Sequence, residues 1–331
     1  MVVVAVAGGT GGVGRSVLDA IAESGKHRAI VLSRTAAATT ATNKTKHFAV
    51  DYGNIDCMIQ ILYDNNVEMV VSALLLTDQD VADSQINLIR AAARSGTVTK
   101  FIPSEFYIDF HAPIPGSDLF TNFQLEAETE LLRHPHLTWT LIRVGIFLDH
   151  LTMPHNPKQT YISPFWVFVD IDHEKCVFPG DGSQPLVLTH STDLAACIER
   201  LIGLPAQEWP RESLVASNKL RVKDLASIIE KVTGKEFQIV YDSVEAIHGG
   251  LITPLPSNQA VFSDPKKGEL LHQVELQVML SMLSHAHDLP GQDLTELFPD
   301  VKKTKIEQFL KEGWAIKRAN DQSDLDHREL V

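Results

Sequence analysis

Cysteine is scarce in this chain of 331 residues. The three cysteines, Cys57, Cys176 and Cys197, are an odd number, lie far apart and form no Cys-x-x-Cys pair. A secreted disulfide framework has an even number of cysteines at closer spacing. We therefore predict reduced thiols and a cytoplasmic location.

Long apolar runs and an excess of positive charge are also missing. No stretch approaches the ~20 apolar residues of a membrane helix, and the N-terminal apolar run has strand length and no basic segment before it. The formal net charge of −13 disfavours nucleic acid and acidic membranes as partners, because both require a basic face. We expect a small-molecule partner, and homo-oligomerisation stays open.

The opening residues carry the strongest pattern. Val2 to Val6 have the composition of a buried parallel strand, and a helical repeat begins at Val13. Between them glycines recur at a Gly-x-x-Gly-x-x-Gly spacing. Strand, glycine turn and helix together are typical of a dinucleotide site, in which the helix start faces the diphosphate. The predicted contacts are Gly8, Thr10, Gly11, Gly12, Val13 and Gly14.

The second predicted strand, Ala29 to Ser33, is followed directly by Arg34. An acidic residue at this place would bind the ribose 2′-hydroxyl of NAD, whereas a hydroxyl and a cation suit the 2′-phosphate of NADP. Ser33 and Arg34 therefore favour NADP(H). The alternative is that Arg34 is a solvated surface residue.

Further strands alternate with helices. Strands are expected at 48–52, from Val67, and at 98–102, and helix faces at 55–62 and 81–92. This alternation predicts an α/β fold of the Rossmann type, a doubly wound parallel sheet. Ligands bind at the carboxyl ends of such strands, so Ser72, Ala73, Leu74, Pro103, Ser104 and Glu105 are added to the cofactor contacts.

The character of the chain changes after Leu151. Prolines and aromatic residues replace the strand–helix alternation, and the last residues are polar with little periodicity. We predict an NADP-binding Rossmann domain over 1–150, a smaller α+β substrate-binding region over 151–315 interleaved with the sheet, and a polar, solvated tail over 316–331.

The chain resembles the isoflavone reductase and phenylcoumaran benzylic ether reductase group of the NmrA-like, atypical short-chain dehydrogenase/reductase family. The resemblance is carried by GGTGGVG, by QINLIRAAARSGTVTKFIPSEF (85–106) and by LTWTLIRVGIFLDHL (137–151), and it extends to about Leu310. It implies an NADPH-dependent reductase. It also implies that Glu105 orders the loop and that Tyr107 lies near the nicotinamide.

The catalytic residues of related enzymes are absent. The Tyr-x-x-x-Lys pair of ordinary short-chain dehydrogenases is excluded, because no tyrosine has a lysine four residues later. In the group that this chain resembles, one lysine lies on the helix before strand six, but the helix from Phe120 has none. The family position falls at Gln124, with Leu125 or Asn122 in another register. An amide polarises a carbonyl without delivering a proton, so Tyr107, His150 or water remains as the donor.

The substrate contacts are expected around the sixth strand and after it, at Phe106, Phe147, His150, Met153 and Trp166. Trp166 and its aromatic neighbours either line a pocket for a flat apolar substrate or pack between sheets. His150 is either at the pocket rim or structural. No metal site is predicted, because His134 with His136, and His285 with His287, lack a third ligand.

The sequence thus predicts an NADPH-dependent oxidoreductase acting on an aromatic or polyketide-like small molecule in secondary metabolism. Two alternatives stay open because the family lysine is missing. One is a redox-assisted isomerase or cyclase, and the other is a nonenzymatic regulator that senses NADP(H).

Overall fold

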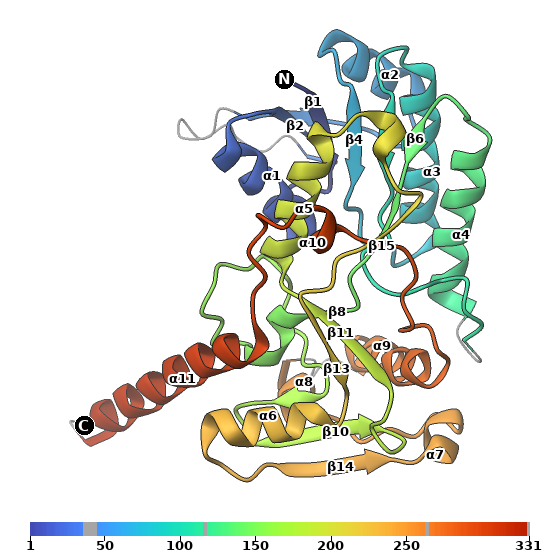
Figure 1. Cartoon of the computed structure of the whole chain (residues 1–331). Helices are drawn as coiled ribbons and strands as arrows, with labels where there is room; N and C mark the ends of the chain where they lie inside the picture. The colour runs from blue at the N-terminus through green and yellow to red at the C-terminus, as the bar shows by residue number, and fades with distance from the viewer. Residues whose placement is uncertain (36–44, 115–117, 262–264, 330–331) are drawn as a thin grey trace.

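The computed structural model describes residues 1–35, 45–114, 118–261 and 265–329 (Figure 1). Its main sheet has six strands in the order β3-β2-β1-β4-β5-β6, every neighbouring pair parallel. This is the strand order of a dinucleotide-binding fold, so the predicted fold class is confirmed. The strands are β1 (Val3–Ala7), β2 (Arg28–Ser33), β3 (Lys46–Ala49), β4 (Met69–Ser72), β5 (Lys100–Ile102) and β6 (Thr138–Trp139).

Both faces of the sheet are buried by helices. In β1, Val4 and Val6 pack against α1 and α5, while Val3, Ala5 and Ala7 pack toward α2, α3 and α4. Side chains alternate along a strand, so a strand covered on both faces must be apolar throughout, as β1 is. The helices are α1 (Gly12–Ser24), α2 (Ile55–Asp64), α3 (Gln79–Arg94), α4 (Asp118–Leu132) and α5 (Ser191–Gly203).

The chain after residue 151 contributes to both halves of the molecule. Helix α5 lies beside α1 (Figure 1). Strand β12 (Glu212–Leu214) pairs in parallel with β7 (Leu141–Arg143), and β15 (Gln292–Asp293) pairs with β12. The later chain therefore returns to the carboxyl-end side of the first sheet, where the candidate site lies.

A second core lies below the sheet in Figure 1, where two small sheets and several helices pack together. Ile108 and Phe110, which follow β5, are buried in it and link the two halves. Its elements and the remaining ones are β8 (Ile146–Phe147), η1 (Leu148–Thr152), β9 (Val169–Asp170), β10 (Lys175–Pro179), β11 (Pro185–Thr189), η2 (Ala206–Glu208), β13 (Asn218–Arg221), α6 (Asp224–Thr233), β14 (Gln238–Asp242), α7 (Val244–His248), α8 (Pro256–Val261), α9 (Pro265–Leu283), α10 (Leu294–Leu297) and α11 (Ile306–Glu329).

The structure defines the bounds of two predicted elements. The strand expected at 48–52 is β3, which ends at Ala49, because the Asp51 carboxylate accepts the Gly53 N–H and turns the chain. The polar, solvated tail predicted from residue 316 lies in α11, which continues to Glu329 and projects from the body (Figure 1), and residues 318–323 are exposed. The one-turn pair Lys317–Asp321, 2.8 Å apart, supports the helix there.

Candidate cofactor and substrate site

Close main-chain packing shapes the glycine turn, residues 8–14. Gly8 has φ +75°, and a Cβ there would lie 2.4 Å from the Ala73 carbonyl oxygen after β4. A Cβ on Gly14 would lie 2.5 Å from the Gly8 carbonyl oxygen. Any side chain at either position would push the turn, β4 and α1 apart.

The start of α1 is open toward a ligand. A Cβ on Gly11 would meet no atom within 4 Å, and the same holds for Gly12. Gly11 is the N-cap and supplies no side-chain hydrogen bond, and the first turn contains no acidic residue. The N–H groups of a helix start attract an anion where no acidic side chain lies in the first turn. Thr10 is exposed beside this space and Val13 is half-buried, so the turn fits a diphosphate.

The end of β2 presents one cation. Ser33 is buried and its hydroxyl donates to the Thr35 carbonyl at 2.6 Å, so it supports the loop. Arg34 is exposed, and no described residue forms an ion pair with it. Below them the Tyr52 hydroxyl donates to the Leu32 carbonyl at 3.1 Å. Arg34 therefore remains available to a 2′-phosphate.

The carboxyl ends of β4 and β5 are joined to each other. The Ser104 hydroxyl donates to the Leu74 carbonyl at 2.8 Å, and the Ser104 N–H donates to Gln85 at 2.9 Å. Ala73 and Leu74 are half-buried and Pro103 is buried. The Ser72 hydroxyl is buried with no hydrogen-bond partner among the described residues. This edge is thus ordered by hydrogen bonds between side chains and the main chain, and the Ser72 hydroxyl stays without a partner in the described part of the chain.

Glu105 belongs to a buried charge cluster. Arg143, fully buried at the end of β7, lies 3.1 Å from Glu105, 3.1 Å from Asp109 and 3.0 Å from Glu212. Burial raises the pKa of Glu105 to about 8, although Arg143 opposes the shift. These bonds hold the segment after β5 in place, which is the ordering role that the family resemblance implies for Glu105.

Helix α4 separates the two amide candidates. Gln124 lies one turn before Glu128, whose carboxylate is 2.7 Å from His111 beside the Arg143 cluster. Asn122 instead lines a groove between α3 and α4 on the outside of the molecule, together with Asp83. The side-chain carbonyl oxygen of Gln124 is buried, and no described residue donates to it. Of these two residues, Gln124 is the one that presents an unused polar atom inside the protein.

Tyr107 is directed into the second core. Its hydroxyl lies 3.3 Å from the Ser281 hydroxyl on α9, and its ring meets the edge of His287 at 5.6 Å between centroids. Burial raises the pKa of Tyr107 to about 12 and lowers that of His287 to about 3. Neither group holds a proton that it can release readily near neutral pH.

His150 is also a poor proton donor. Burial lowers its pKa, opposed by the neighbouring Asp149 carboxylate and by a hydrogen bond with the Phe165 backbone. Its Nδ1 atom is buried without a hydrogen-bond partner among the described residues, and its ring meets the edge of Phe165 at 5.9 Å. A neutral imidazole here can accept a hydrogen bond.

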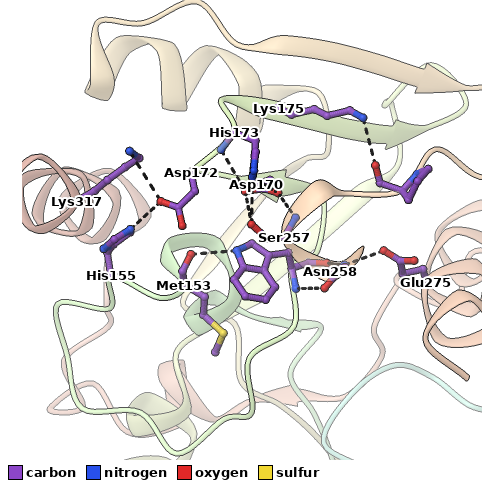
Figure 2. Close-up of polar contacts among 12 residues, drawn as sticks. Met153, His155, Asp170, Asp172, His173, Lys175, Ser257, Asn258, Glu275 and Lys317 are labelled. Carbon is purple, nitrogen blue, oxygen red and sulfur yellow. Dashed lines mark hydrogen bonds and ion pairs between the residues drawn. The ribbon is translucent and has the colours of Figure 1, made fainter. Parts of the chain in front are cut away.

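The remaining substrate candidates lie in two different cores. Phe106 is buried and Phe147 half-buried against the α1–α5 side of the sheet. Met153 and Trp166 lie in the second core, where the Trp166 indole N–H donates to the Met153 carbonyl at 3.1 Å (Figure 2). Asn258 bonds both backbone groups of Trp166. Trp166 therefore packs between elements, which was the second of its two interpretations.

Two residues important to the site were missed in the sequence. Arg143 follows Leu141 and Ile142 in an apolar strand, and only the fold reveals three carboxylates around it. The signal in the sequence that could have identified Arg143 was a charged residue inside an otherwise apolar strand. Tyr161, one of the aromatic neighbours of Trp166, was expected to line a pocket or to pack between sheets, but its carbonyl contacts the glycine turn.

Two further findings bear on ligands. In the described ranges no group of three or more His, Cys, Asp or Glu side chains could hold a metal ion. No helix in the same ranges is both long and apolar enough to cross a membrane. The open start of α1, the exposed Arg34 and the close-packed Gly8 and Gly14 fit NADP(H).

Known proteins resemble the chain over almost its full length. The model of the NmrA-like family matches residues 2–310. Oxidoreductase swnN of Metarhizium robertsii is 70% identical, covering 96% of this chain and 99% of that protein. Oxidoreductase swnN of Arthroderma benhamiae is 63% identical, with 96% and 99% covered. The leucoanthocyanidin reductase–NADPH complex from Vitis vinifera has a TM-score of 0.68 at 17% identity, with 95% and 99% covered. The chain therefore belongs to the NmrA-like family and is an oxidoreductase.

Proposed function

We propose that this oxidoreductase uses NADPH to reduce an aromatic or polyketide-like small molecule of secondary metabolism. The observation that carries the proposal is the glycine turn, where Gly8 and Gly14 tolerate no Cβ while Gly11 faces open space. A turn that needs glycine for packing at two positions and leaves the third open is built for close approach of a ligand.

Each end of the cofactor would meet a different part of the chain. The N–H groups at the start of α1 would hold the diphosphate, and Arg34 the 2′-phosphate. Leu74 and Ser104, joined at 2.8 Å, would border the nicotinamide end. NADPH, when bound, supplies the hydride.

The chain's own residues would position the substrate rather than protonate it. The side-chain carbonyl oxygen of Gln124, which has no donor among the described residues, would accept a hydrogen bond from the substrate. Tyr107 and neutral His150 are poor acids for the reasons given above. The proton would therefore come from water. The same lack of an acid favours a second candidate, a redox-neutral isomerisation or cyclisation assisted by the cofactor.

An absorbance assay separates these candidates. NADPH oxidation at 340 nm is followed with a panel of aromatic ketones, enones and benzylic ethers, while products are identified by mass spectrometry. Loss of absorbance with a reduced product supports the reductase. A rearranged product at constant absorbance supports the redox-neutral reaction, and no binding of NADPH by calorimetry contradicts both.

Arg34 tests the choice of cofactor. Arg34→Ala should weaken the binding of NADPH by about tenfold or more and leave the binding of NADH unchanged, because only NADPH carries the 2′-phosphate. Arg28→Ala, at the opposite end of β2 and bonded to the Asn65 carbonyl at 3.1 Å, is the matched control. Equal losses for both cofactors would contradict the assignment.

A further inference from the structure

The segment around Tyr161 contacts the glycine turn. The Gly12 N–H, the first in α1, donates to the Tyr161 carbonyl at 3.1 Å. This N–H belongs to the group that would face the diphosphate. A residue from the region after Leu151 therefore takes one donor of the proposed cofactor site.

The segment is residues 160–162, and its tip is the Tyr161 side chain. The tip contacts two half-exposed side chains of α1. The Tyr161 hydroxyl donates to the Asp19 carboxylate at 2.7 Å, and the Arg15 guanidinium lies 5.1 Å from the centre of the Tyr161 ring. Arg15 and Asp19 are 3.6 Å apart with side chains 40% and 41% exposed. Water and salt weaken polar contacts at such exposure, so the tip is held loosely.

The base of the segment is Thr160, which is held by partly buried hydrogen bonds. The Thr160 hydroxyl donates to the Asp149 carboxylate at 2.5 Å, and Asp149 is fully buried. Asp149 also accepts the Ser191 N–H at 2.9 Å and the Ser191 hydroxyl at 2.7 Å. On the other side of Tyr161, the Ile162 N–H donates to the Thr160 hydroxyl at 3.1 Å. Movement of the segment is therefore easiest at Tyr161 itself.

The Tyr161 carbonyl and a diphosphate would need the same donor. One N–H makes one strong hydrogen bond, and a charged phosphate oxygen is a stronger acceptor than a neutral carbonyl. We propose that Tyr161 is an internal competitor for the diphosphate position, which NADPH displaces from Gly12 on binding. The proposal rests on the proposed cofactor site. It makes the Tyr161–Asp19 bond a determinant of NADPH affinity, because that bond must loosen as the carbonyl leaves.

Tyr161→Phe tests this competition by removing the bond to Asp19 and keeping the ring. NADPH affinity is measured by calorimetry, and association and release by stopped-flow NADPH fluorescence. We expect a Kd about two- to tenfold lower with faster association, the effect of weakening one hydrogen bond of ordinary strength. Tyr63→Phe is the matched control, because Tyr63 is 59% exposed on α2, away from the glycine turn.

Asp19→Ala removes the same bond from its other partner. It should also tighten NADPH binding, and combining it with Tyr161→Phe should add less than the sum of the two effects. Hydrogen exchange of the Gly12 amide without cofactor gives a reading independent of NADPH. Exchange should be faster in Tyr161→Phe than in wild type or Tyr63→Phe.

The opposite results are distinct. Weaker binding or faster NADPH release in Tyr161→Phe would overturn the proposal, because the segment would then clamp the cofactor. An unchanged Kd would overturn it as well. Failure of the wild-type protein to bind NADPH would instead contradict the proposed function.

Discussion

The glycine turn and the Arg143 cluster lie at the same edge of the sheet but are built from different groups, backbone atoms in the turn and charged side chains in the cluster. In the turn, the specific groups are backbone atoms, and glycines bring them within van der Waals contact. In the cluster, charged side chains from β7, β12 and the segment after β5 meet in a buried position. The turn is encoded by neighbours in sequence, whereas the cluster depends on the completed fold. Substitutions should therefore affect the two regions in different ways.

The largest effect is expected at Arg143. Arg143→Met approximately keeps the volume of the side chain but removes the buried cation that contacts Glu105, Asp109 and Glu212. An uncompensated buried charge costs about 3–5 kcal/mol of unfolding free energy. Arg133→Met is the control, because its partner Glu130 is buried but Arg133 itself is 64% exposed, and an exposed pair contributes about 1 kcal/mol or less. Urea unfolding measures both, and equal losses would contradict the role of burial.

The glycine turn should separate packing from binding. Gly14→Ala places a Cβ 2.5 Å from the Gly8 carbonyl oxygen, so we expect a loss of roughly 2–3 kcal/mol in stability and no NADPH binding. Gly11→Ala meets no protein atom within 4 Å and should cost about 1 kcal/mol or less. Gly11→Ala should nevertheless weaken the binding of NADPH, because the added methyl group enters the space proposed for the diphosphate. Thermal unfolding and calorimetry distinguish the two, and a Gly11→Ala variant with wild-type affinity would contradict this assignment.

Stability should depend on pH through Glu105. Its folded pKa of about 8 lies above its ordinary value of 4.5, so the folded protein keeps a proton that the unfolded chain releases. The stabilisation is complete below about pH 4.5 and is lost as the pH rises toward about 8. A shift of this size corresponds to a change on the order of a few kcal/mol in unfolding free energy. Glu105→Gln should flatten urea-derived stability between these values, and an unchanged slope would show that another group is responsible.

Features encoded by neighbours in sequence could be predicted, whereas features that depend on the completed fold could not. The glycine turn at Gly8 and Gly14 and the parallel sheet were predictable, because periodic strands and a local glycine turn leave few alternatives. Whether Gln124 or Asn122 faces inward depends on the rotation of α4 about its axis, which packing against α3 and the His111 segment decides. Trp166 could not be assigned, because one indole suits a pocket wall and a core equally until Asn258 is placed beside it. The sequence predicted a polar tail without assigning it a helix, because its residues lack an apolar periodicity, whereas α11 continues through it to Glu329.

Restoring a lysine compares the two faces of α4. Gln124→Lys places an ammonium group at the position of the buried carbonyl oxygen, to which no residue in the described ranges donates. Burial lowers a lysine pKa, so reduction by this variant should gain a pH dependence and change rate by about tenfold or more. Asn122→Lys, in the outer groove, should leave the pH–rate profile unchanged. Steady-state rates from pH 6 to 9 measure the effect, and a response to Asn122→Lys alone would reverse the assignment of the faces.

The smallest effect is expected at Tyr107, which follows β5. The Tyr107 hydroxyl forms one hydrogen bond with the Ser281 hydroxyl at 3.3 Å, and Ser281 also contacts the Val278 carbonyl at 2.8 Å and His287 Nε2 at 3.1 Å. Tyr107→Phe therefore removes one neutral hydrogen bond, worth about 0.5–1.5 kcal/mol, and retains the ring against His287. Because a phenol with a pKa of about 12 is a poor acid at neutral pH, kcat should change by less than about threefold. A loss of about a hundredfold with unchanged stability would show that Tyr107 donates the proton after all, and would return catalysis to a side chain.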